Sequence, residues 1–173
     1  MTVKFKAGII DNQNEKFTRD IKEIDTSHLQ DGNVLIKIDY SSLNYKDALI
    51  LKDGGKIVRK FPFVPGIDFS GKIVESGDDK FKKDETVICT GFRVGEMYYG
   101  GFSQYAKVDS NFLIKNPKDI DAEKSMMLGT AGFTALQCSF AIKAREELLL
   151  GDKVNDVLVT GATGGVGSIA VMI

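Results

Sequence analysis

The sequence predicts a mainly β domain over residues 1–120, followed over residues 121–173 by the beginning of an α/β domain. Three observations lead to this prediction. Short alternating segments fill the first part, helical spacing begins after Pro117, and a glycine-rich turn follows residue 160. Short strands joined by irregular loops over such a length favour a barrel or a sandwich.

The strands of the first domain are predicted from apolar and polar residues that alternate with a period of two, the pattern of a half-buried strand. The N-terminal segment shows this pattern from Val3 to Ile9. Further strands, each bounded by glycine, aspartate or charged residues, are expected at 34–40, 71–75, 86–90 and 103–108. A short helix is expected at 44–51.

The second domain is predicted to start with a helix, because apolar residues after Asp121 are spaced like a buried helical face. These residues are Met126, Met127, Leu128, Phe133, Leu136, Phe140 and Ile142. A strand is then expected at 157–160, a glycine turn at 161–167, and a helix from Ser168 onward. The order strand, turn, helix begins a unit that the chain does not complete, so we expect a truncated domain.

Composition excludes several functional classes. With 43% apolar and 27% charged residues and a net charge of -1, the chain has no electrostatic footprint for nucleic acid or an anionic membrane. No secretory signal is visible, and we find no apolar stretch of the ~18 residues needed to span a bilayer. Two cysteines make no disulfide framework. We therefore expect a cytoplasmic protein that acts on a small molecule.

The glycine turn is the strongest local motif. Glycines let a backbone approach a pyrophosphate closely, and the N-terminus of the following helix offers free N–H groups and a positive dipole end. Against the six-residue dinucleotide fingerprint, Ala162 stands at the first glycine position, with Gly164 and Gly167 at the second and third. The alternative is a tight turn without a ligand. The run 160–167 also fits the short-chain dehydrogenase pattern, but that family has the motif near its N-terminus.

Four segments together carry a family resemblance: 41–48 (SSLNYKDA), 61–71 (FPFVPGIDFSG), 129–135 (GTAGFTA) and 160–168. The chain resembles, over essentially all of its length, the zinc-independent members of the medium-chain dehydrogenase/reductase superfamily that are named quinone oxidoreductases or acryloyl-CoA reductases. The resemblance implies a GroES-like catalytic barrel, a Rossmann domain, NADPH as cofactor and a homodimer of the full-length protein.

The residues also argue against a metal. A catalytic zinc needs three protein ligands, and zinc-dependent relatives have a cysteine at Asn44 and a His-Glu pair at 67–68. His28 is interpreted as a solvated turn residue, and Cys89 and Cys138 as small buried apolar groups. Neither cysteine has a partner at ligand spacing.

The resemblance also implies roles for individual residues. Tyr45 is the candidate catalytic group, a hydrogen-bonding partner of substrate and nicotinamide, or else an aromatic packed over the barrel mouth. Asn44 is expected at the nicotinamide ribose, or alternatively as a helix cap. Thr130 is expected at the nicotinamide end, or in helix packing. The remaining cofactor-binding candidates, which would hold the pyrophosphate, are Ala162, Thr163, Gly164, Gly165, Val166 and Gly167.

The function that follows is an NADPH-dependent, zinc-free reductase that transfers hydride to an activated C=C bond of an enoyl substrate or to a quinone. NADH stays open, since the discriminating residue lies ~20 residues beyond the turn. The alternative is a non-catalytic barrel module or a truncated product. Asp68 is expected to fix a barrel loop by hydrogen bonds, with a role as a base as the alternative if its carboxylate is buried. A basic patch of Lys56, Arg59 and Lys60 is expected to be a solvated face, with CoA phosphates as the alternative.

Overall fold

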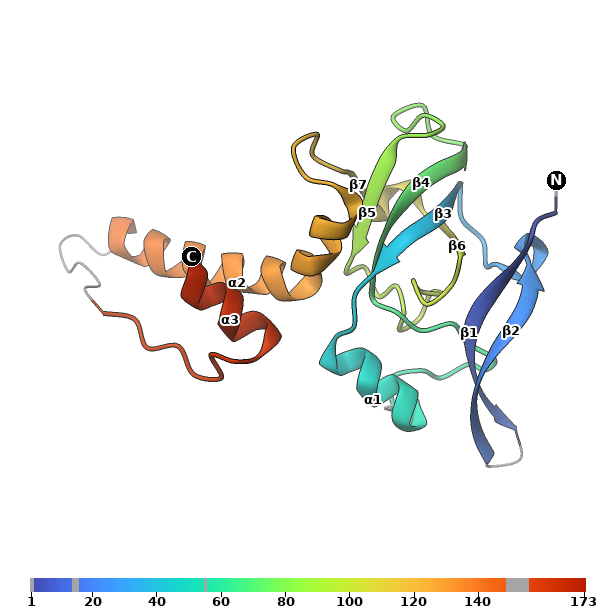
Figure 1. Cartoon of the computed structure of the whole chain (residues 1–173), viewed down its shortest axis with the longest axis horizontal. Coiled ribbons are helices and arrows are strands. Elements are labelled where there is room, and N and C mark those ends of the chain that lie inside the picture. The colour runs from blue at the N-terminus through green and yellow to red at the C-terminus, as the bar shows by residue number, and fades with distance from the viewer. Residues whose placement is uncertain (1, 14–15, 55, 149–155) are drawn as a thin grey trace. The chain divides into compact units, whose positions relative to one another are not determined.

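The alternating segments of the first half form two antiparallel sheets in the computed structural model, which describes residues 2–13, 16–54, 56–148 and 156–173 (Figure 1). A two-stranded sheet pairs β1 (Lys4–Gln13) with β2 (Lys16–Asp25). A five-stranded sheet has the order β6-β3-β4-β5-β7. Its strands are β3 (Val34–Ser41), β4 (Asp68–Ser76), β5 (Thr86–Thr90), β6 (Tyr105–Val108) and β7 (Leu113–Lys115).

Strand β3 contributes to the core on both of its faces, because successive side chains point to opposite sides of a sheet. Val34 and Ile36 are fully buried in the core of the five-stranded sheet, together with residues of β4 and β5. Leu35, between them, packs instead with Phe5 and Ala7 of β1. Strand β3 therefore packs against the core of its own sheet on one face and against β1 of the two-stranded sheet on the other.

Helix α1 (Tyr45–Asp53) is placed by a third apolar cluster. Its buried residue Ile50 packs with Ile10 of β1 and with Val58 and Phe63 of the following loop. The helix ends at Gly54, whose left-handed φ of 80° suits glycine and whose N–H donates to the Ile50 carbonyl over 2.8 Å. Two short 3₁₀ helices, η1 (Thr26–His28) and η2 (Ser110–Phe112), complete this part.

The loop after Pro65 is held by contacts between main-chain atoms that lie so close together that only glycine fits at these positions. Gly66 has a φ of 106°, and its carbonyl accepts from the Gly101 N–H over 2.8 Å. A Cβ on Gly100 would lie 2.1 Å from the same carbonyl oxygen, and one on Gly95 would lie 2.6 Å from it. We call Gly66, Gly95, Gly100 and Gly101 the glycine interlock. It fixes the backbone immediately before β4.

The structure divides into two units, Met1–Met127 and Leu128–Ile173. Helix α2 (Ala122–Leu148) begins in the first unit, where Ser70 Oγ donates to the Ala122 carbonyl over 2.9 Å. Its helical geometry is interrupted at Gly129, with φ 46° and ψ -148°. The second unit contains the rest of α2 and helix α3 (Gly165–Met172). The boundary expected at residue 120 stays a prediction.

Most predicted elements are found. The strands expected at 34–40, 71–75, 86–90 and 103–108 appear as β3, β4, β5 and β6, and the expected helices appear as α1, α2 and α3. The prediction of a strand at 157–160 is wrong, since no described strand lies beside this segment to complete a ladder. The prediction that Cys138 is buried is also wrong: Cys89 is buried, but Cys138 lies on an uncovered face of α2.

By length and composition, one described helix qualifies as a candidate membrane span, Ala122–Arg145 within α2. The sequence was expected to hold no such stretch. Core helices of soluble proteins pass the same test, and Gly129 interrupts this one, so the finding assigns no membrane role.

Candidate functional site

The start of α1 is built around two buried carboxylates. Asp47 and Asp68 are both completely buried, Asp47 on α1 and Asp68 as the first residue of β4. Asp68 Oδ2 accepts hydrogen bonds from Ser42 Oγ over 2.8 Å and from Asn44 Nδ2 over 2.9 Å. The two side chains thereby connect the end of β3 to the start of β4. We call Ser42, Asn44, Asp47 and Asp68 the carboxylate cluster.

Asp47 satisfies two backbone donors that would otherwise be buried without a partner. Its Oδ2 accepts from the Asn44 N–H over 2.8 Å, and its Oδ1 accepts from the Ile67 N–H over 3.0 Å. Burial raises the pKa of Asp47 above its ordinary value, the two backbone hydrogen bonds act in the opposite direction, and the nearby Asp68 adds a further increase. Asp47 is thus a positioning group for both α1 and the loop at Ile67.

Tyr45, the candidate catalytic residue, is the first residue of α1 and is 80% exposed. Its hydroxyl makes no hydrogen bond with the described part of the chain, so the group is available to a ligand. Asn44 is the N-cap of α1, which is one of the two roles predicted for it. Its side-chain amide donates a hydrogen bond to Asp68. Asp68 makes the hydrogen bonds expected of it. The roles of Tyr45 and Asn44 toward a ligand stay predictions.

In the second unit, the glycine turn has the backbone that a pyrophosphate site requires. Gly161 has a φ of 62°, and its carbonyl accepts from the Gly164 N–H over 2.9 Å. A Cβ on Gly167 would lie only 2.1 Å from the Gly161 carbonyl oxygen. The N-cap of α3 is Gly164, which offers no capping side chain, so the first N–H groups of α3 stay open to an acceptor.

Thr130 lies on α2 in the same unit as the turn. Its carbonyl accepts from Thr134 Oγ1 over 2.7 Å. Its neighbour Ala131 is in contact range of the start of α3, where a Cβ on Gly165 would lie 3.5 Å from the Ala131 Cβ. Thr130 and the six residues 162–167 therefore come from neighbouring parts of one unit. Their contact with a cofactor stays a prediction.

Sequence reasoning missed three residues of these sites. Ser42 and Asp47 were not singled out, although Asn44 and Asp47 have the spacing of a capping box. Gly161 was placed outside the six-residue fingerprint, yet it is the residue with positive φ and the one against which Gly167 packs. A search for positions that only glycine can occupy would have found it.

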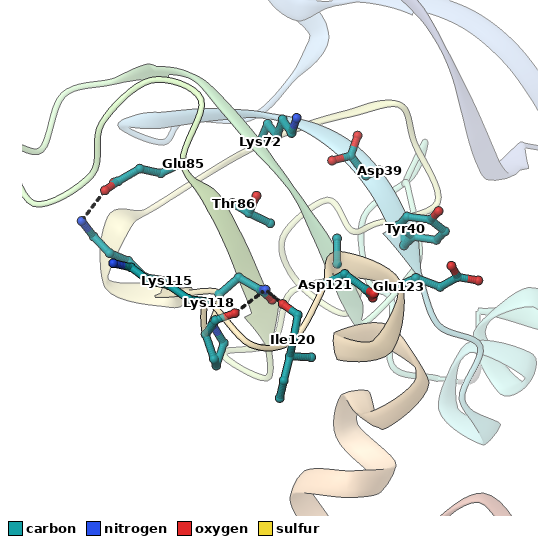
Figure 2. Close-up of a pocket in the computed structure, with 13 residues that line it drawn as sticks. Asp39, Tyr40, Lys72, Glu85, Thr86, Lys115, Lys118, Ile120, Asp121 and Glu123 are labelled. Carbon is teal, nitrogen blue, oxygen red and sulfur yellow. Dashed lines mark hydrogen bonds and ion pairs between the residues drawn. The ribbon is translucent and has the colours of Figure 1, made fainter.

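The remaining polar features are consistent with structural roles. His28 pairs with Asp25 at 3.1 Å on the surface, as expected for a turn residue. Within the described residues, no group of three His, Cys, Asp or Glu side chains is arranged to hold a metal. A cavity of about 750 Å³ beside β5, β7 and the start of α2 is lined by side chains of both charges (Figure 2). Lys115 and Glu85 on its wall pair with each other at 2.7 Å, so the cavity shows no preference for one sign of charge.

Comparison with known proteins supplies the family. The model of the alcohol dehydrogenase GroES-like domain matches residues 30–118, about half of the chain. Acrylyl-CoA reductase AcuI of Ruegeria pomeroyi is 43% identical over 171 residues, which are 98% of this chain and 51% of that protein. A chloroplast envelope quinone oxidoreductase homolog of Arabidopsis thaliana is 34% identical over 146 residues, covering 82% of this chain and 43% of that protein.

Two crystal structures are similar in fold. The yhdH oxidoreductase of Salmonella enterica in complex with NADP has a TM-score of 0.90 and 40% identity, covering 96% of this chain and 50% of that one. The Bacillus subtilis protein yhfP with NAD bound has a TM-score of 0.87 and 40% identity, covering 98% and 50%. The chain thus spans about half the length of the proteins it matches.

These matches confirm the predicted fold, a mainly β GroES-like barrel followed by the start of an α/β domain. They also confirm the resemblance on which the residue assignments were based. The chain belongs to the alcohol dehydrogenase GroES-like domain family, within the medium-chain dehydrogenase/reductase superfamily.

Proposed function

We propose that the complete protein is a nicotinamide-coenzyme-dependent reductase that transfers hydride to an activated C=C bond of an enoyl substrate or to a quinone, without a metal. The observation that carries the proposal is the turn from Gly161 to Gly167, whose backbone leaves no room for a side chain at Gly167. Relatives of the same fold bind NADP or NAD. NADPH is the proposed cofactor, and NADH is the alternative.

The residues of this chain fit such a coenzyme. The open N–H groups at the start of α3, with residues 162–167, would bind the pyrophosphate, because a helix N-terminus favours negative charge. Asn44 and Thr130 would contact the nicotinamide end. The bound coenzyme supplies the hydride.

Tyr45 would act on the substrate. Its exposed hydroxyl would donate a hydrogen bond to the carbonyl oxygen that gains charge during the reaction, and it would help to protonate the product. The carboxylate cluster holds Tyr45 in place, because Asp47 and Asp68 fix the first turn of α1 from two directions.

The proposal is tested in the complete protein by following NADPH oxidation with an acrylyl thioester, a simple enone and a quinone. Tyr45→Phe is expected to lower turnover at least about tenfold. The matched control is Tyr98→Phe, which removes the same hydroxyl from a ring that packs on Phe112. Equal turnover of the two variants would remove Tyr45 from the mechanism.

The second candidate is a barrel module without catalysis, or a truncated product. The observation that favours it is that the matching domain model covers residues 30–118, which lie in the barrel. Whether the reading frame continues past codon 173 with further strands and helices separates the two. Assembly as a homodimer and a cytoplasmic location are proposed on the family resemblance alone.

A further inference from the structure

The candidate catalytic residue depends on its neighbours for its position. The Tyr45 side chain is 80% exposed, and among the described residues neither its ring nor its hydroxyl has a partner. The place of the hydroxyl is therefore set by the backbone of the first turn of α1. Whatever holds that turn decides where the hydroxyl meets a substrate.

Two neighbouring residues hold this turn from different directions. Successive residues of an α-helix point about 100° apart, so Asp47 and Lys46 face different parts of the first unit. Asp47 is buried and accepts from the Ile67 N–H over 3.0 Å. Lys46 is half exposed, and its Nζ donates to Glu96 Oε1 over 2.8 Å. This ion pair attaches the outer side of the turn to a loop that lies 50 residues further along the chain.

Glu96 belongs to a loop, residues 91–98, that is held by the core and by its own hydrogen bonds. Val94 is fully buried in the core of the five-stranded sheet. The Arg93 carbonyl accepts from the Glu96 N–H over 3.1 Å. Gly95 is part of the glycine interlock. The Glu96 carboxylate is thus presented to α1 from a fixed support.

The same loop keeps two residues in an unfavourable backbone conformation. Phe92 has a φ of 51° and Arg93 a φ of 63°, in the left-handed region that residues other than glycine rarely adopt. Such conformations persist only where the surrounding structure imposes them, and they gather at functional sites. The shape of this loop therefore fits a role in positioning functional groups.

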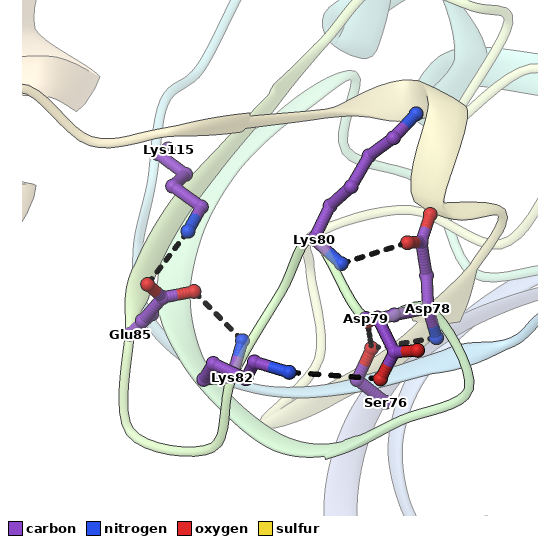
Figure 3. Close-up of polar contacts among 7 residues, drawn as sticks. All are labelled: Ser76, Asp78, Asp79, Lys80, Lys82, Glu85 and Lys115. Carbon is purple, nitrogen blue, oxygen red and sulfur yellow. Dashed lines mark hydrogen bonds and ion pairs between the residues drawn. The ribbon is translucent and has the colours of Figure 1, made fainter.

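An ion pair in the loop between β4 and β5 shows the contrast. Lys82 lies 3.6 Å from Asp79 there, and both side chains are well exposed (Figure 3). Such a pair contributes little, because water and salt screen it. The Glu96 side chain is only 17% exposed, so water competes less for Lys46 and the attraction is stronger. The pair of Lys46 and Glu96 is therefore better suited to hold a geometry.

We propose that Glu96 is a positioning residue for the reaction: through Lys46 it fixes the first turn of α1 and thereby the Tyr45 hydroxyl. The inference rests on the proposed function, in which that hydroxyl acts on the substrate. A displacement of about 1 Å can cost about a hundredfold in rate. Loss of the ion pair therefore slows turnover, whereas coenzyme binding, whose proposed pyrophosphate site lies in the second unit, is little affected.

The test is steady-state kinetics of the complete protein with NADPH and whichever of the acrylyl thioester, the enone and the quinone it reduces fastest. Glu96→Gln is expected to lower kcat about fivefold or more and to leave the KM for NADPH within about twofold of the parent's. Lys46→Met removes the same ion pair from α1 and should cause the same loss, whereas Lys46→Arg keeps the charge and should retain kcat. The control is Asp79→Asn, which breaks the exposed pair with Lys82 and is expected to leave both constants unchanged.

A double variant shows whether Glu96 acts through Tyr45. Because Tyr45→Phe already removes the hydroxyl, adding Glu96→Gln to it is expected to cost no further turnover, whereas independent effects would multiply. Multiplied effects, a parental kcat in Glu96→Gln, or an equal loss in Lys46→Arg would each overturn the proposal.

Fluorine NMR separates this inference from the proposed function. In the 173-residue chain labelled with a fluorotyrosine, the Tyr45 resonance is assigned with Tyr45→Phe and is expected to shift in Glu96→Gln. The resonances of Tyr40 and Tyr105 are expected to stay in place, which shows that the variant is folded. An unchanged Tyr45 resonance would overturn the inference whatever the activity. A shifted resonance together with no NADPH oxidation by the complete parent protein would count against the proposed function alone.

Discussion

Replacing Asp47 with alanine removes the acceptor of two hydrogen bonds from buried backbone groups. The Asn44 N–H starts α1, and the Ile67 N–H belongs to the loop that the glycine interlock holds. A buried donor left without a partner costs about 1–3 kcal/mol, so the two together cost about 2–6 kcal/mol. Burial of the carboxylate is itself unfavourable, as its raised pKa indicates, and relief of that cost lowers the expected loss to about 2–4 kcal/mol.

Urea unfolding followed by tyrosine fluorescence measures this loss in the first unit alone. The chain has no tryptophan, and its five tyrosines all lie within Met1–Met127: Tyr40, Tyr45, Tyr98, Tyr99 and Tyr105. With a slope of about 2 kcal/mol per molar urea, the midpoint is expected to fall by about 1–2 M. The control, Asp31→Ala, removes an exposed carboxylate and is expected to change the free energy of unfolding by less than about 0.5 kcal/mol.

The pH dependence of the same measurement has a defined sign. Since burial raises the pKa of Asp47 in the folded state, its stabilising contribution is fully present below its unfolded-state pKa and decreases as pH rises through the folded-state pKa. The difference in free energy of unfolding between the parent chain and Asp47→Ala should therefore be larger in acid than at neutral pH. A loss no larger than that of the control, or a difference that grows with pH, would refute the reasoning.

Three further predictions concern the second unit and the thiols. In the complete protein, Gly167→Ala should weaken NADPH binding about tenfold or more, because its Cβ would lie 2.1 Å from the Gly161 carbonyl oxygen. Gly77→Ala, the same change at a glycine of the first unit, should bind normally in the same titration, and equal affinities would contradict the turn's role. A thiol reagent should label Cys138 in the native chain and Cys89 only after denaturation, since burial raises the pKa of Cys89 to about 12. Two labelled thiols in the native chain would disprove this. The 173-residue chain alone should bind NADPH weakly or not at all, because a complete βαβ unit takes about 30 residues; micromolar affinity by fluorescence would contradict that expectation.

Strands and helices could be predicted from the sequence where one periodic pattern of apolar residues was enough to identify the element. Residues 86–90 alternate and are bounded by charge, and β5 has those limits. Strand β2 was missed because its charged residues hide the alternation, and its antiparallel pairing with β1 is a contact that no local pattern supplies. At residues 157–160 the local pattern favoured a strand, but a strand also needs a neighbour, which no local pattern can supply.

The candidate site was predictable in its residues but not in its connections. Asn44, Tyr45 and the glycine turn were identified from motifs, and Asp68 was expected to make hydrogen bonds. The complete burial of Asp47 and Asp68 depends on contacts between segments that are far apart along the chain, such as the hydrogen bonds of Asp68 with Ser42 and Asn44. Cys138 shows the opposite error. Its residue type predicted burial, but burial also depends on which other segments cover α2, and the residue type does not describe them.

The glycine interlock has a consequence for how this barrel can change over evolution or in the hands of a protein engineer. Backbone contacts among these glycines hold the loop that leads into Asp68, and the Asp47 carboxylate adds a side-chain contact at the Ile67 N–H. An exposed side chain at the start of α1, such as that of Tyr45, can then be exchanged without moving the backbone that carries it. In a scaffold of this kind the backbone position of the site does not depend on its reactive side chain. Different reactive groups can therefore be placed at the same position.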